Sequence, residues 1–230
     1  MSSNQDTGRL PRRLREELER DHAPVRPLRP PWQRATVVAV WFVGILLAAP
    51  TLLGLRPDAE TLGMAWLWGP PLVQVLFGLV LVTLALREAV PGQSLPSPWI
   101  GALAILAVGT QLASALGTYL VSHGVTPPPG ASFLDGSACA RSEALLGLPA
   151  LVVTLWLAVR AYPVRPVHAG LLGGLGAGLF ADGVQHLQCG VSGLHHVLVW
   201  HLGGMLICAL IGAATGWVLE RVRAARMARP

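Results

Sequence analysis

The sequence contains no lysine and almost no polar stretch beyond residue 34. Its 17 basic residues are all arginine, in a chain of 230 residues that is 13% charged and 53% hydrophobic. Because no polar stretch after residue 34 is long enough to form a soluble domain, the length does not indicate one. Apolar runs of about 20 residues recur instead, which is the length that an α-helix needs to cross a bilayer. The composition is therefore typical of a membrane protein with several crossings.

Three further absences narrow the class of protein. Residues 1–34 have no apolar core and no small-residue cleavage site, so they are not a signal peptide. The three cysteines are too few for a disulfide framework, and no C-x-x-C pair, the usual motif of a thiol oxidoreductase, is present. The net charge of +5 does not indicate nucleic-acid binding, because the arginines lie at the ends of apolar segments, where orientation signals occur.

We predict an all-α integral membrane protein with six transmembrane helices. They are placed at residues 35–55, 64–86, 99–121, 144–161, 167–186 and 194–219. The chain then divides into a tail (1–34), a six-helix transmembrane domain (35–220) and a basic C-terminal tail (221–230). In the fifth segment, Gly170, Gly174 and Gly178 recur at every fourth position, which predicts close approach of a neighbouring helix.

The distribution of arginine predicts the orientation. With the tail inside, fifteen of the 17 arginines lie on the inner side, and only Arg56 and Arg141 lie outside. Cytoplasmic segments carry an excess of arginine and lysine, so both termini are predicted to be cytoplasmic. The loop at residues 122–143 and the turn around Cys189 then lie on the outer face.

The N-terminal tail carries an amphipathic pattern. Leu10, Leu14 and Leu18 recur at every fourth position on an arginine- and glutamate-rich background, which predicts a short helix with a narrow leucine stripe. That helix should end by Ala23, because the residue before Pro24 is disfavoured in a helix. A proline-rich extended spacer follows at residues 24–31. A helix of this length is marginal in water, so we expect the tail to order on a partner.

Residues 185–201 hold four of the seven histidines and one cysteine. His186 and Cys189 are spaced H-x-x-C, and Cys139 is predicted near the end of the outer loop, on the same face of the membrane. Thiolate and imidazole groups suit zinc, cadmium or copper. The candidate metal ligands are Cys139, His186, Cys189, His195, His196 and His201. Three alternatives stay open: a stable metal site, a redox- or metal-responsive thiol pair, and an inert disulfide beside interfacial histidines.

Other polar residues carry weaker indications. Cys208 falls halfway along the sixth segment and is expected to be a small buried hydrophobic residue. Gly190–Gly193 contains G-x-S-G, but Ser192 lies in a short turn only nine residues before His201, which disfavours a serine protease. Asp182 and Gln185 are expected to line the outer surface; a membrane-embedded Asp182 would instead be a functional candidate.

Several motifs together resemble one family. The tail reads L-x-x-x-L-x-x-x-L followed by A-P-V-R-P-L-R-P-P, and the later half contains C-A-R-S-E-A-L-L-G-L-P, R-A-Y-P-V-R-P, a glycine-rich fifth segment, the outer cysteine and Trp200-His201. This combination, with six apolar segments, resembles the NrsF family of membrane anti-sigma factors, negative regulators of sigma F. One departure is Gln188, where the family usually has histidine directly before the second cysteine.

The resemblance implies a regulator in the inner membrane of a bacterium, without catalytic activity. Residues 10–29 would bind an extracytoplasmic-function sigma factor, through Leu10, Leu14, Leu18, Val25 and Leu28. Cys139 and Cys189 would take part in sensing heavy metals or oxidants. No cofactor is required, although a zinc, cadmium or copper ion could bind transiently at the outer cysteines.

A different class of protein would use the same outer residues. A metal-handling transporter or a membrane thiol oxidoreductase is the alternative hypothesis. A transporter should place polar ligands near the bilayer midplane, and only Gln74, Gln111 and Cys208 are candidates there. The sequence predicts no oligomeric state.

Overall fold

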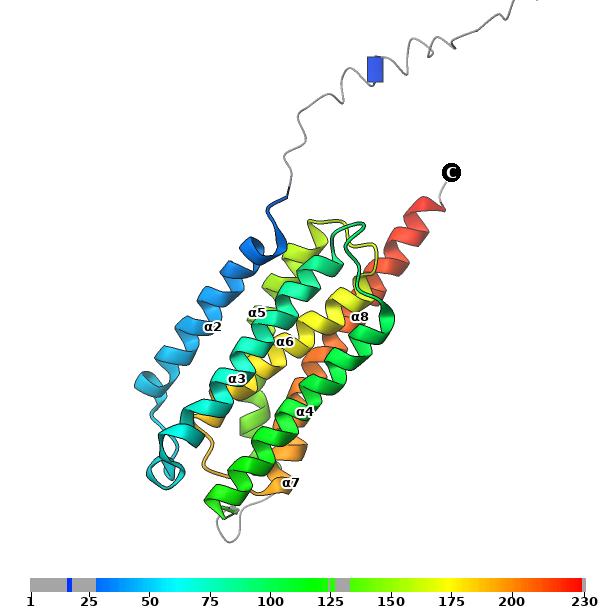
Figure 1. Cartoon of the computed structure of the whole chain (residues 1–230). Coiled ribbons are helices and arrows are strands. Elements are labelled where there is room, and N and C mark those ends of the chain that lie inside the picture. The colour runs from blue at the N-terminus through cyan, green and yellow to red at the C-terminus, as the bar shows by residue number, and fades with distance from the viewer. Residues whose placement is uncertain (1–15, 18–27, 124, 127–132, 229–230) are drawn as a thin grey trace, which may run out of the picture.

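The computed structural model describes residues 16–17, 28–123, 125–126 and 133–228 (Figure 1). The predicted sigma-binding residues Leu10, Leu14, Leu18 and Val25 lie outside the described residues. Leu28 is described, and half of its surface is exposed.

Six helical segments of the described chain are long and apolar enough to cross a membrane. The first five are α2 (Pro31–Leu53), α3 (Ala59–Glu88), α4 (Ser97–Ser122), α5 (Ser137–Val159) and α6 (Pro166–His186). The sixth consists of α7 (Leu194–His196), a π-helical turn (Val197–His201) and α8 (Leu202–Met227). The prediction of an all-helical protein with six such segments is confirmed.

Helix α5 begins earlier than the hydrophobic run predicted. It starts at Ser137 rather than at residue 144, so Cys139 lies in the first turn of the helix and not in the preceding loop. The segment from Ser137 to Glu143 contains two alanines and neither glycine nor proline, so its helix propensity extends the helix beyond the apolar stretch. This shift also places Glu143 inside the helix.

Helix α6 is the centre of the bundle. In its most apolar 18-residue window 83% of residues are buried, against 22–44% in the other five segments. Its glycines explain how neighbours approach it: a Cβ on Gly176 would lie 2.6 Å from the carbonyl oxygen of Gly78 on α3. On the other side, a Cβ on Gly170 would meet the backbone of Gly212, and one on Gly174 the backbone of Cys208 and Ala209, both on α8. The predicted close packing along the glycine stripe is confirmed.

The two ends of the bundle carry different parts of the chain. The start of α2 and the end of α8 lie at one end, and α7 lies at the other, together with the end of α4 (Figure 1). An even number of antiparallel helical segments requires this arrangement. The turn that contains Cys189 is therefore far from both chain ends of the bundle.

Candidate functional site

Two thiols meet at the end of the bundle that contains α7. Cys139 comes from the first turn of α5, and Cys189 from the turn between α6 and α7. Their sulfur atoms lie 3.6 Å apart, well beyond the disulfide bond length of about 2.05 Å. Both are free thiols. The pKa of the Cys189 thiol is raised, first by its contact with Cys139 and then by burial, so Cys189 holds its proton more tightly than an exposed thiol.

Two histidines complete the group. His196 Nε2 lies 3.5 Å from Cys189 Sγ, and the rings of His196 and His201 are 5.4 Å apart between centroids. One ligand atom from each of Cys139, Cys189, His196 and His201 lies within 4.8 Å of all the others. We call these four residues the thiol-imidazole cluster. The structure thus brings together four of the six predicted metal ligands.

The π-helical turn accounts for the pairing of His196 with His201. In an α-helix, residues five positions apart differ by about 140° around the axis and point to different sides. A π-helical turn closes its hydrogen bonds between residues five apart, which returns the two side chains to one face. The π-helical turn spans Val197–His201, so it brings the side chains of His196 and His201 to the same face.

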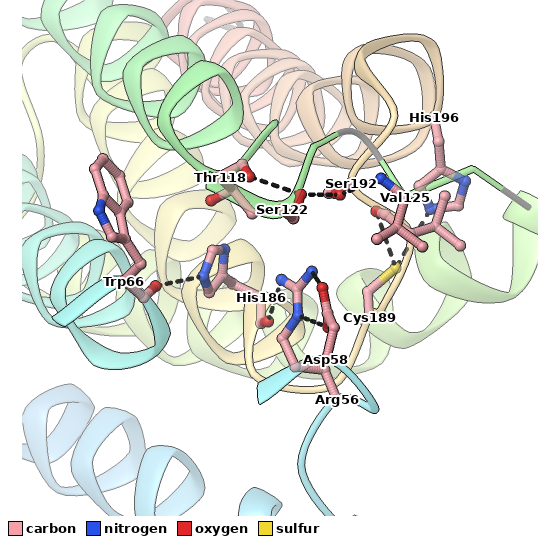
Figure 2. A network of polar contacts seen from close by, with 11 residues as sticks. Arg56, Asp58, Trp66, Thr118, Ser122, Val125, His186, Cys189, Ser192 and His196 are labelled. Carbon is pink, nitrogen blue, oxygen red and sulfur yellow. Dashed lines mark hydrogen bonds and ion pairs between the residues drawn. The ribbon is translucent and has the colours of Figure 1, made fainter. Parts of the chain in front are cut away.

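The other two predicted ligands lie elsewhere. His186 Nε2 donates a hydrogen bond to the carbonyl oxygen of Trp66 on α3 at 3.1 Å, away from Cys189 (Figure 2). Within the described chain, neither His186 nor His195 belongs to the cluster. Because α6 ends at His186, the H-x-x-C spacing does not continue on one helical face.

The turn that carries Cys189 is fixed on both sides (Figure 2). The Arg56 side chain donates to both carboxylate oxygens of Asp58, at 2.6 and 2.9 Å, and to the carbonyl of His186 at 3.3 Å. Ser192 shares a 2.5 Å hydrogen bond with Ser122, and its oxygen accepts from the amide of Val125 at 3.0 Å. Ser192 therefore joins two loops, and the serine–histidine pair of a protease is not formed.

Asp182 does not line the outer surface as predicted. Its side chain is buried on α6, where every residue from Leu172 to His186 is buried, and Gln185 is among them. Asp182 Oδ1 accepts a 2.8 Å hydrogen bond from His201 Nδ1, and its Oδ2 accepts one from Gln74 Nε2 at 2.5 Å. Gln74 also donates to Gln111 at 2.7 Å. This chain of hydrogen bonds links the cluster to α3, α4 and α6.

Glu143 is a site residue that the sequence reasoning missed. It lies one helical turn after Cys139, is fully buried, and both carboxylate oxygens lack a hydrogen-bond partner within the described structure. A carboxylate oxygen of Glu143, a carboxylate oxygen of Asp182 and a ring nitrogen of His201 all lie within 4.8 Å of one another. The rule that carboxyl groups inside a membrane are costly would have identified it. The predicted span began at residue 144, which left Glu143 in a loop.

A small cavity of about 20 Å³ lies between the cluster and the buried network. Cys189, His201, Asp182, Gln111 and Thr118 are among its lining residues. This is room for one water-sized species. The Cys189 thiol and the Asp182 carboxylate therefore line the same polar cavity.

The family of negative regulators of sigma F, NrsF, matches residues 18–221. The chain belongs to the NrsF family. It is 29% identical to the Anti-sigma-F factor NrsF of Caulobacter vibrioides (strain NA1000 / CB15N) over 202 residues, which cover 83% of this chain and 90% of the relative. No solved structure matches the chain. The family description names a negative regulator, and the relative is named an anti-sigma factor.

Proposed function

We propose that this NrsF family member holds an extracytoplasmic-function sigma factor at the inner membrane through residues 10–29. It releases the sigma factor when a heavy-metal ion or an oxidant modifies Cys139 and Cys189. Family membership supports the anti-sigma activity. An amphipathic helix laid in a groove of its partner is a common mode of recognition, and the leucine stripe of the tail suits it.

One observation carries the sensor half of the proposal. The two thiols lie 3.6 Å apart at the end of the bundle that contains α7, opposite to the start of α2 and the end of α8 (Figure 1). The excess of arginine near the chain ends supports a cytoplasmic tail and outer thiols. The thiols then face the oxidising compartment, where modification is favoured, while the sigma-binding segment stays with the transcription machinery.

Modification would change the contact between α5 and the α6–α7 turn. In oxidation, each thiol loses a proton to solvent, two electrons pass to the oxidant, and a bond of about 2.05 Å forms between sulfurs now 3.6 Å apart. In metal binding, two thiolates are held by one ion. The disulfide and the metal-bound pair each favour a helix packing that differs from the packing of the free thiols. A conformational switch requires that the modified and unmodified states prefer different conformations in this way.

A sigma-dependent reporter in the native host tests both halves. Cys139→Ser with Cys189→Ser should retain repression and lose induction by cadmium or oxidant, while Cys208→Ser, the matched buried thiol, should respond as the wild type does. Leu14→Glu with Leu18→Glu should give constitutive transcription. Induction that is unchanged in the double cysteine variant would remove the sensor half. Normal repression by the leucine variant would remove the sigma-binding half.

A further inference from the structure

His201 joins the thiol-imidazole cluster to the interior of the bundle. The residue is 4% exposed, and its Nδ1 donates a hydrogen bond to Asp182. Its second ring nitrogen, Nε2, is buried and has no hydrogen-bond partner within the described structure. An unsatisfied buried polar atom costs about 1–3 kcal/mol. Such an atom in a folded protein calls for an explanation, and a bound ion is one.

The spacing of the cluster matches a tetrahedral metal site. Bond lengths typical of zinc sites, about 2.3 Å to sulfur and 2.0–2.1 Å to nitrogen, place neighbouring ligand atoms about 3.4–3.8 Å apart. The distance between the two sulfurs is 3.6 Å, and that from Cys189 Sγ to His196 Nε2 is 3.5 Å. The remaining separations are within 4.8 Å, so a shift of about 1 Å would complete the coordination.

We propose that Cys139, Cys189, His196 and His201 form a four-coordinate site for a soft or borderline cation such as Zn²⁺, Cd²⁺ or Cu⁺. Asp182 is its positioning residue. The inference deepens the proposed function and rests on it in treating the two thiols as the sensing groups. When a divalent ion binds, the protons of both thiols leave to solvent, and two thiolates balance the two positive charges. Thiolate and imidazole ligands select such ions over magnesium or calcium.

Asp182 supplies the orientation of the fourth ligand. A carboxylate only accepts hydrogen bonds, so Nδ1 of His201 carries the proton and Nε2 keeps its lone pair for a metal. Ligating histidines are commonly held in this way by a carboxylate on the far side of the ring. Gln74 holds Asp182 in turn at 2.5 Å. Loading of the site at the outer face is therefore transmitted to α3 and α6.

A competing set of ligands shares His201. Glu143, Asp182 and His201 also approach one another within 4.8 Å, and a site with two carboxylates would take harder ions such as Mn²⁺. Both oxygens of Asp182 are already engaged, by His201 and by Gln74, which favours its role as a positioning residue. Glu143→Gln distinguishes the two sets.

The test is a titration of the reduced, full-length protein in detergent with Co²⁺, followed by competition with Cd²⁺. We expect a thiolate-to-cobalt charge-transfer band together with the intense ligand-field bands of tetrahedral Co²⁺. Asp182→Asn should weaken binding about 10–100-fold and keep the tetrahedral spectrum, and Asp182→Glu should restore part of the affinity. His196→Gln and His201→Gln should each weaken binding further and alter the spectrum.

Matched controls keep the result interpretable. His195→Gln and Cys208→Ser remove an imidazole and a thiol from the same part of the chain without touching the cluster, and should bind Co²⁺ with unchanged affinity. If Asp182→Asn does not fold, as judged by size-exclusion elution, His196→Gln still tests the site, because His196 lies outside the buried network of Asp182 and Gln74.

Three results would overturn the inference. The first is an octahedral spectrum without charge transfer, and the second is wild-type affinity in both His196→Gln and His201→Gln. The third is binding that survives Cys139→Ser with Cys189→Ser and is lost in Glu143→Gln, which would assign the ion to the carboxylates. If any of these results is found while induction of the reporter still requires both thiols, the thiol sensor remains supported and only the four-coordinate site is rejected. A tetrahedral site in a protein whose induction ignores both thiols would instead remove only the proposed function.

Discussion

At the scale of single residues, Arg56 supports one side of the turn that holds Cys189. Its side chain is buried, and it donates to both oxygens of Asp58 and to the carbonyl of His186. The planar guanidinium supplies all three hydrogen bonds from one rigid group, which a lysine ammonium cannot reproduce. The position of Cys189 therefore depends on an arginine that is distant in sequence.

We expect Arg56→Ala to expose Cys189. Hydrogen bonds to charged groups contribute about 1.5–3 kcal/mol each, but Asp58 is partly exposed, so the net loss of stability should be about 1–3 kcal/mol. The rate at which a maleimide alkylates Cys189, in a Cys139→Ser background, should rise, and Arg56→Lys should recover only part of the protection. Arg87→Ala, which removes an exposed arginine at the other end of α3, is the control. An unchanged alkylation rate in Arg56→Ala would show that the turn is held by its backbone contacts alone.

The composition of the cluster could be predicted only in part. Cysteine and histidine are recognisable ligands in any sequence, so Cys139, Cys189, His196 and His201 were all among the candidates. The selection among the histidines could not be made, because a spacing of five places His196 and His201 on different faces of an ordinary α-helix. The π-helical turn that pairs them is a local departure from the α-helix that no residue pattern announces.

At the scale of helices, the glycines of α6 determine how the bundle packs. The Cβ of a residue at Gly174 would meet the backbone of Cys208 and Ala209, and a backbone cannot rotate away as a side chain does. Gly203, on α8, has nothing within 4 Å of its Cβ position. The two positions therefore form a matched pair, one at a helix crossing and one in open space.

We expect Gly174→Ala to destabilise the bundle and Gly203→Ala to leave it unchanged. Overpacking a tight contact costs about 1–3 kcal/mol, and here α6 and α8 must separate to admit the methyl group. The measurement is the midpoint of thermal unfolding in detergent, followed by size-exclusion chromatography. Equal midpoints in the two variants would mean that the crossing of α6 and α8 is looser than the structure has it.

Helix ends were predicted less well than helix centres. The apolar runs identified six segments, because a bilayer leaves few alternatives to a continuous helix. They did not identify the start of α5, because helix propensity there extends into polar sequence that the bilayer criterion ignores. Glu143 was missed for this reason.

At the scale of the whole molecule, hydropathy alone indicates the central helix only weakly. All six segments are apolar enough to cross a membrane, and α6 is the least apolar of them, which agrees with its central position but does not specify which helices pack against it. The glycine content of α6 indicated close neighbours but not how many. The burial of Asp182 follows from this central position, because the helices packed around α6 keep its carboxylate out of lipid.

Orientation is the property of the whole chain on which the sensor depends. In the sequence, fifteen of the 17 arginines precede or begin α2, lie at the α3–α4 and α5–α6 connections, or lie in and after the last turns of α8, and we expect this asymmetry to hold both termini in the cytoplasm. A green fluorescent protein fused after residue 230 should fluoresce, and alkaline phosphatase fused there should be inactive. Phosphatase inserted between residues 127 and 132 should be active, because that loop is expected to face the oxidising side. Phosphatase activity at the C-terminus would place Cys139 and Cys189 in the reducing cytoplasm, where a disulfide does not persist, and would leave metal binding as the way in which the pair could respond.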